Sequence, residues 1–142
     1  MIKPDATERN LIGHVIRRIE GAHFKIVALR MVRLTEADAR RFYAVHQGKP
    51  FLDGLVAFMT SGNAVPMVLE KENAVEDTRA LIGATNPAKA ACGTLRQEIG
   101  VDIEKNSVHA SDSDENAQKE IAFFFPDLKQ ERPDRMIRTG RL

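Results

Sequence analysis

Apolar side chains recur along the chain with two periods, and the change of period marks the elements. Between Leu11 and Ile19 they stand three and four residues apart until Gly21, which predicts an amphipathic helix packed on a sheet. Residues 24–34 are instead apolar and β-branched, interrupted only by basic side chains. This stretch predicts a mostly buried strand.

Two short helical runs follow. Thr35 and Asp38 have capping-box spacing, so we expect a helix from there to about Tyr43. Pro50 then begins a second run. Its apolar face consists of Phe51, Leu52, Leu55, Val56 and Met59. Together the two runs predict a helical hairpin.

In the middle of the chain, strand and helix patterns alternate again. Residues 64–70 predict a strand that Pro66 weakens, because proline cannot donate to a ladder and indicates an edge or a bulge. Asn73 is expected to cap a helix over residues 74–82, and Gly83 to end it. A loop over 84–93 then leads to a short helical piece.

The last elements are a brief strand at Val108 and His109 and a helix that Asp112 or Ser113 caps. That helix is expected to run to about residue 125, where Pro126 stops it. The alternation along the whole chain predicts an α+β sandwich, with an antiparallel sheet covered by helices.

Composition limits the architecture and the class of partner. At 142 residues and 43% hydrophobic, the chain is expected to form one domain over 1–142. Residues 129–142 hold five basic against two acidic side chains and are interpreted as a C-terminal surface extension. A net charge of +1 argues against a dedicated nucleic-acid partner. The single Cys92 and the lack of a long apolar run favour a cytoplasmic protein without a membrane partner.

Candidate chemistry centres on His109. It lies among small hydroxyl and carboxylate residues before a helix start, a suitable place for a nucleophilic histidine, although a lone histidine is more often structural. Glu120 falls on the apolar stripe of the last helix, where burial is costly unless the carboxylate is paired. An exposed salt-bridge role for Glu120 is equally open. The remaining histidines show no metal-ligand spacing and are interpreted as structural or surface residues: His14, His23 and His46.

Phosphate binding, if present, must come from side chains. Neither a Gly-x-x-x-x-Gly-Lys-Ser/Thr loop nor a Gly-x-Gly-x-x-Gly turn occurs, which excludes the P-loop class. The cationic candidates are Lys3, Arg79 and Arg96, since guanidinium groups bind phosphate oxygens bidentately and lysine supplies a compact charge. Taken singly, each of them would be read as a solvated surface charge.

Four motifs connect these residues. KPDA at 3–6, GATNP at 83–87, GTLR at 93–96 and NSVHASDS at 106–113 stand in the order found in the nucleoside diphosphate kinase family, which the chain resembles, in its bacterial type, from Ile2 to about Phe125. The resemblance implies a ferredoxin-like βαββαβ sandwich with a four-stranded antiparallel sheet. Family members usually carry several more residues before Lys-Pro-Asp, so we expect the first strand to be truncated.

The resemblance also implies the reaction. The γ-phosphoryl group of ATP, or of another nucleoside triphosphate, would pass to a nucleoside diphosphate by a ping-pong mechanism through pros-phosphohistidine at His109. Glu120 and Ser111 would orient the ring, and Tyr43 would donate toward the transferring group. No metal would be held directly by the protein, since Mg²⁺ would arrive on the nucleotide phosphates.

Nucleotide contacts are implied in the same way. Lys3, Arg79 and Arg96 would bind phosphates, with Thr85 adding a hydroxyl and Asn106 contacting the ribose. Phe51 is the base-stacking candidate, because an aromatic face accepts any base, and Leu55 and Ile103 would close the slot. From the residues alone, Thr85 equally fits a local cap. Core packing is the alternative for the apolar residues Phe51, Leu55 and Ile103.

Other interpretations of the chain start from the features in which its sequence departs from the family. Ala110 stands where the family usually has glycine, and would shift the backbone if that position needed a positive φ. Ala110 and the short start together leave a non-catalytic nucleotide-binding or protein-interaction module on the same scaffold as the alternative, and an RNA-binding sheet as a weaker one. The resemblance implies a homo-oligomer, a tetramer or alternatively a hexamer. The short start and the basic tail predict that the stability of the chain depends strongly on assembly.

Overall fold

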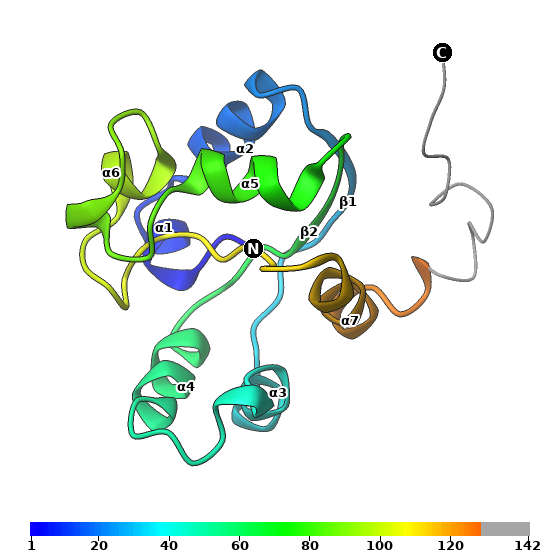
Figure 1. The fold of residues 1–142 in the computed structure, drawn as a ribbon. Coiled ribbons are helices and arrows are strands. Elements are labelled where there is room, and N and C mark those ends of the chain that lie inside the picture. Colours follow the sequence, from blue (N-terminus) through cyan, green and yellow to red (C-terminus); the bar gives the residue numbers. More distant parts are fainter. Residues whose placement is uncertain (129–142) are drawn as a thin grey trace.

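A computed structural model of the chain describes residues 1–128 (Figure 1). Its sheet has two antiparallel strands, β1 (Lys25–Leu29) and β2 (Met67–Glu70). Single bridges extend it, because Ile2 pairs with both Val65 and Val108, and Val32 with Ala64. The extension expected over 129–142 lies outside the described residues.

Within residues 1–128 the sheet consists of two regular strands and isolated bridges, so the four-stranded sheet expected from the sequence is not confirmed. The backbone explains why the segments on either side of Ile2 pair only as short bridges. Pro66 interrupts the segment after Val65 because it has no N–H to donate. Ser107 has a φ of 74°, so the extended backbone at Val108 cannot continue in the N-terminal direction.

β1 differs from its prediction as a mostly buried strand over 24–34. It is shorter, and both of its end residues are exposed, because in the described part of the chain it pairs with β2 alone. The register shifts in β1, between Ile26 and Ala28, and not at Pro66, where the sequence indicated an edge or a bulge. Val27 and Ala28 consequently pack against the same hydrophobic cluster.

Helices cover both faces of the sheet (Figure 1). On one face, α2 (Ile12–Gly21) and α5 (Ala74–Ile82) pack on β2. The other face carries α3 (Glu36–Phe42), α4 (Leu52–Thr60) and α7 (Asp114–Phe124). β2 serves both layers, since Met67 and Leu69 join the first cluster and Val68 the second. The α+β sandwich is therefore confirmed.

The helical hairpin α3–α4 forms as predicted. Thr35 accepts from the backbone of Asp38, whose side chain accepts in return, so the capping box is present. Phe42 at the end of α3 packs against Phe123 and Phe124 of α7, with ring centroids 5.3 and 5.1 Å away. These contacts attach the hairpin to the rest of the fold.

Two cap predictions have different outcomes. Ser113 accepts from the N–H of Asn116 and caps α7. Asn73, by contrast, makes no side-chain cap and adopts a φ of 55°, so its cap prediction is wrong. Asparagine tolerates the left-handed region, and here it supplies the turn that precedes α5.

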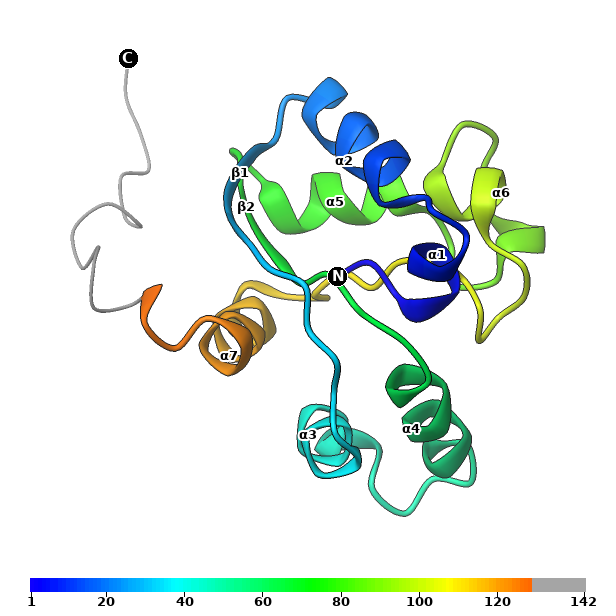
Figure 2. The ribbon, with the colours of Figure 1, turned by 180° about the vertical axis from the view of Figure 1, so that it is seen from behind.

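Short elements complete the described chain. The helices α1 (Pro4–Glu8) and α6 (Leu95–Ile99) lie at the same end of the molecule in both views (Figure 2). Two 3₁₀ turns, η1 (Ala44–His46) and η2 (Pro87–Lys89), connect longer helices. Within residues 1–128 no helix is long and apolar enough to cross a membrane.

Candidate active site

His109 is held at its backbone and at its ring. Its N–H donates to the carbonyl of Met1 at 2.8 Å, continuing the pairing at Val108. The side chain is 28% exposed, and its Nε2 lies 2.9 Å from Oε1 of Glu120. Ser111 donates to the other oxygen of that carboxylate. Glu120 is thus a paired carboxylate, as its place on the apolar stripe indicated, and Ser111 contacts this carboxylate.

The partner of Nε2 fixes the state of the ring. A carboxylate accepts, so Nε2 carries the hydrogen and the lone pair of a neutral ring is on Nδ1. Among the contacts of residues 1–128, none occupies Nδ1. Burial lowers the pKa of His109 below its usual range, and Glu120 offsets this only in part. The ring is therefore neutral near pH 7, with Nδ1 available as a nucleophile.

The pKa values of Glu120 and of the nearby Tyr43 are also shifted. Burial alone would raise the pKa of Glu120, but hydrogen bonds from His109 and Ser111 hold it below its usual range. Burial raises the pKa of Tyr43, and the charge of Glu120 adds to this effect. Tyr43 thus keeps its proton at neutral pH and remains a donor.

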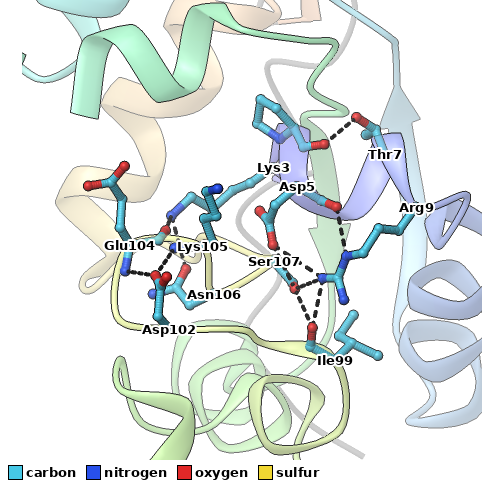
Figure 3. Close-up of polar contacts among 11 residues, drawn as sticks. Lys3, Asp5, Thr7, Arg9, Ile99, Asp102, Glu104, Lys105, Asn106 and Ser107 are labelled. Carbon is cyan, nitrogen blue, oxygen red and sulfur yellow. Dashed lines mark hydrogen bonds and ion pairs between the residues drawn. The ribbon is translucent and has the colours of Figure 1, made fainter. Parts of the chain in front are cut away.

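A second group of residues gathers around Asn106 (Figure 3). Asn106 is 3% exposed; its Oδ1 accepts from Nζ of Lys3 at 2.9 Å, and its Nδ2 donates to the carbonyl of Thr85 at 3.0 Å. Lys3 also donates to the carbonyl of Glu104 at 2.8 Å. Burial lowers the pKa of Lys3 to about 8. Three of the residues expected to bind nucleotide are therefore brought together.

Arg96 links the two groups. It is 8% exposed and donates to the carbonyl of Val108 at 2.8 Å and to that of Gly83 at 3.1 Å. Its Nε has no hydrogen-bond partner in the described chain. Burial lowers the pKa of Arg96 to about 10, with the charge of Arg79 acting in the same direction. Arg79 itself is exposed on α5, close enough to Arg96 for the two positive charges to repel each other.

Gly83, between α5 and the loop that leads to α6, has a backbone conformation that requires glycine. Gly83 ends α5, as predicted, with a φ of 85°. A Cβ there would lie 2.7 Å from Cβ of Thr94. Both the angle and the contact exclude other side chains, so the 83–87 loop can approach the start of α6.

Phe51 stands apart from the polar groups. It precedes α4 and is 51% exposed, so it does not join the buried face of the helix. Ile103 is 63% exposed, on a loop whose Asp102 accepts from the next backbone N–H groups. The first turn of α4 lies close to this loop, because a Cβ on Gly54 would lie 3.9 Å from Oε2 of Glu104. Leu55, on α4, is half-buried.

Two aromatic residues near the site were not identified from the sequence. Phe42 packs edge-on against His109, with centroids 5.7 Å apart. His46, interpreted as structural or surface, stacks on Tyr43 at 6.2 Å and meets Phe51 edge-on at 5.2 Å. The position of Phe42 beside Tyr43, at the end of a predicted helix, could have indicated that Phe42 lies near the site. No local signal indicates the position of His46 between two site candidates.

The departure at Ala110 does not disturb the backbone. Ala110 is absent from the described residues with positive φ, whereas Ser107 is among them. The left-handed position therefore precedes the histidine instead of following it. Alanine at 110 therefore needs no special conformation.

Comparisons with known proteins agree with this geometry. A family model described as nucleoside diphosphate kinase matches residues 1–130. The nucleoside diphosphate kinase of Desulfatibacillum aliphaticivorans is 51% identical over 129 residues, which is 91% of this chain and 94% of that protein. That of Anaeromyxobacter sp. (strain Fw109-5) is 54% identical over 127 residues, 89% of this chain and 87% of its own.

Solved structures give the same answer. The nucleoside diphosphate kinase of Aquifex aeolicus matches with a TM-score of 0.86 and 44% identity, covering 89% of this chain and 92% of its own. A halophilic one from Halobacterium salinarum, solved in complex with CDP, matches with a TM-score of 0.85 and 42% identity, covering 89% and 84%. The chain therefore belongs to the nucleoside diphosphate kinase family of nucleotide-binding phosphotransferases.

Proposed function

We propose that His109 carries the phosphoryl group between two nucleotides in a ping-pong reaction. In the first half-reaction, the Nδ1 lone pair forms a bond to the γ-phosphorus of a nucleoside triphosphate. The bond from that phosphorus to the bridging oxygen breaks, and the diphosphate leaves with the electron pair. A second diphosphate then takes the group from pros-phosphohistidine. The observation that carries this mechanism is the 2.9 Å contact of Nε2 with Glu120, which leaves Nδ1 free.

Side chains around the histidine would hold the phosphates. Arg79, Arg96 and Lys3 supply positive charge, and the unpartnered Nε of Arg96 offers a donor that a phosphate oxygen can satisfy. Thr85 would add its hydroxyl. Tyr43 would donate to the transferring group, since its raised pKa keeps the phenol protonated.

The sugar and base would extend away from this group. Asn106 would contact the ribose, and Phe51 would stack on the base, with Leu55 and Ile103 along the sides of the slot. Exposure of half of the Phe51 side chain supports this role, because a core residue would be covered. A stacking surface accepts any base, so purine and pyrimidine nucleotides should both serve; the Halobacterium relative was solved with CDP.

Kinases of this family generally act with a divalent metal, and we propose Mg²⁺. Within residues 1–128 no three histidine, cysteine or carboxylate side chains gather as metal ligands. The metal would therefore reach the site on the nucleotide phosphates, where it would offset part of their negative charge. The protein residues around it are the cations already described.

We also propose that the whole chain forms one domain and that its core corresponds to a ferredoxin-like sheet. Ile2 pairs with both Val108 and Val65, and the segment of Val65 continues into β2, which pairs with β1. These pairings support the order Val108 segment, Ile2 segment, β2, β1. A homo-oligomer, a tetramer or a hexamer, is proposed as the working form, supported by exposed apolar side chains such as Met31.

Labelling with γ-labelled ATP tests the mechanism. The wild-type protein should take up label that is lost in acid, survives base and is discharged by any nucleoside diphosphate. His109→Ala should take up none. His14→Ala is the matched control, because His14 also pairs with a carboxylate, Glu98 at 3.2 Å, but lies outside the site. Full labelling of His109→Ala would refute the assignment.

A further inference from the structure

A buried polar cluster lies beside the proposed site, between α1 and the turn before His109 (Figure 3). Asp5 is 7% exposed, and its Oδ2 accepts from Ser107 Oγ at 3.1 Å and from Arg9 Nη2 at 3.3 Å. The same Arg9 nitrogen donates to Ser107 Oγ at 3.0 Å and to the carbonyl of Ile99 at 2.7 Å. Three side chains thus close a ring of contacts.

Ser107 has an unusual backbone. Its φ is 74° and it is fully buried, at 0% exposure. The other described non-glycine residues with a positive φ are exposed and are asparagine or histidine. These residue types adopt the left-handed conformation more readily than serine. Such a conformation persists only where the surroundings determine it. Here Asp5 and Arg9 hold the serine hydroxyl.

The turn at Ser107 connects the two halves of the site. Its carbonyl accepts from the N–H of Lys3 at 2.9 Å. Asn106, immediately before it, holds Nζ of Lys3 at 2.9 Å, and His109 follows two positions later. Rotation of the backbone at Ser107 would therefore change the direction of Asn106 relative to His109.

We propose that Asp5, Ser107 and Arg9 are positioning residues for the phosphoryl transfer, which lock the left-handed turn so that Asn106 and His109 face the same nucleotide. This inference rests on the proposed phosphohistidine mechanism. The residues act through Asn106 and His109 and do not themselves touch the phosphates.

The cluster is not explained by stability alone. Oδ1 of Asp5 is buried without a hydrogen-bond partner in the described chain, and an incompletely satisfied buried carboxylate costs free energy. Strain at Ser107 adds to this cost. An arrangement that only stabilised the fold would not need either feature, whereas a fixed turn beside a nucleophile does.

Ser107→Gly is the principal test. Glycine adopts a positive φ without strain but has no hydroxyl, so the turn should form and yet be free to move. We expect a thermal midpoint close to that of the wild type and a single-turnover labelling rate of His109 lower by roughly tenfold or more. Thr7→Ala is the control. Thr7 lies on the same helix and donates to Pro4 and Asn63 carbonyls, so its loss should leave the labelling rate unchanged.

Asp5→Asn keeps the shape of the side chain and removes its charge. The labelling rate should fall as in Ser107→Gly. In addition, the charged groups around Lys3 are Asp5, Arg96, Glu104 and Asp102, and Asp5 is the largest of the influences that raise its pKa. The alkaline limb of the pH profile should therefore move to lower pH in Asp5→Asn and stay in place in Ser107→Gly. A purely structural role would not separate the two variants in this way.

The outcomes distinguish this inference from the mechanism on which it rests. If Ser107→Gly and Asp5→Asn label at the wild-type rate while His109→Ala takes up no label, the positioning role is overturned and the mechanism stands. If His109→Ala is labelled, the mechanism itself fails. A rate loss that only follows the folded fraction, at temperatures below the thermal midpoint, would also overturn the positioning role.

Discussion

Lys3 is a buried cation in the proposed phosphate site. Burial brings its pKa to about 8, although Asp5 opposes the change. Its positive charge is consequently complete only below that pH, whereas the arginines keep theirs. The charge of the phosphate site should therefore depend on pH through this one residue.

We predict opposite effects of pH on binding and on stability. KM for nucleotides should rise as pH increases through about 8, because Lys3 loses its proton. The unfolded chain holds that proton up to the ordinary pKa of 10.5, so the unfolded state binds more protons between these values. The contribution of Lys3 to the free energy of unfolding should then increase with pH over the same window. Lys3→Arg, which stays charged, should lose the pH dependence of KM.

Single residues differ in how far the sequence predicts them. Glu120 was predictable as a paired carboxylate because its apolar neighbours lie within one helix turn, and it does meet His109. The left-handed Ser107 was not predictable. Its conformation depends on Asp5, 102 positions away in sequence, and no local pattern reports such a contact.

At the scale of elements, the α3–α4 hairpin places two candidate residues. Tyr43 follows α3, and Phe51 precedes α4. The helix α3 begins at a capping box, in which Thr35 and Asp38 satisfy each other's backbone N–H groups. The stability of this short helix therefore bears on the position of Tyr43.

Thr35→Ala should destabilise the protein by about 1 kcal/mol, because it leaves a helix N–H unsatisfied. Denaturant unfolding measures the loss. Thr35→Ser keeps the hydroxyl and is the matched control, with an expected change near zero. Equal losses in the two variants would contradict a role for the hydroxyl.

Phe51→Ala should weaken all nucleotides by a similar factor, since stacking is worth roughly 1–3 kcal/mol for any base. Titration with purine and pyrimidine diphosphates gives the comparison. Val45→Ala is the control, because Val45 lies on the same hairpin and is 79% exposed. A loss confined to one base would instead indicate recognition of base edges.

Elements with local determinants were predicted well, and those set by distant partners were not. The capping box and the Gly83 stop depend on residues within a few positions of each other. The burial of β1 depends on which segments pair with it, and among the segments of residues 1–128 only β2 does. Asn73 fits either a cap or a left-handed turn, and the surrounding chain selects the turn.

At the scale of the whole molecule, apolar side chains are exposed at the end of β1. Leu29, its last residue, is 43% exposed and Met31, two residues further on, is 56% exposed, and within residues 1–128 β1 pairs with β2 on one side only. Apolar side chains on an unpaired edge are a common site of association. This feature supports assembly independently of the tail, residues 129–142, which lies outside the described residues.

The thermal midpoint should rise with protein concentration, because subunits that associate only when folded stabilise one another by mass action. Met31→Lys should lower the midpoint and shift sedimentation toward the monomer. Val45→Lys, which also replaces an exposed apolar residue, should do neither. A monomer with a midpoint independent of dilution and full activity would contradict the prediction.

The hairpin that carries Phe51 projects from the sheet (Figure 1), whereas His109 belongs to the segment paired with Ile2 and Met1. A nucleotide that stacks on Phe51 while its phosphates reach His109 would join these parts as a temporary cross-link. Local opening of the hairpin would then require the nucleotide to leave. Amide hydrogen exchange should accordingly slow in α3 and α4 when nucleotide is added, and change much less in α2, on the opposite face of the sheet.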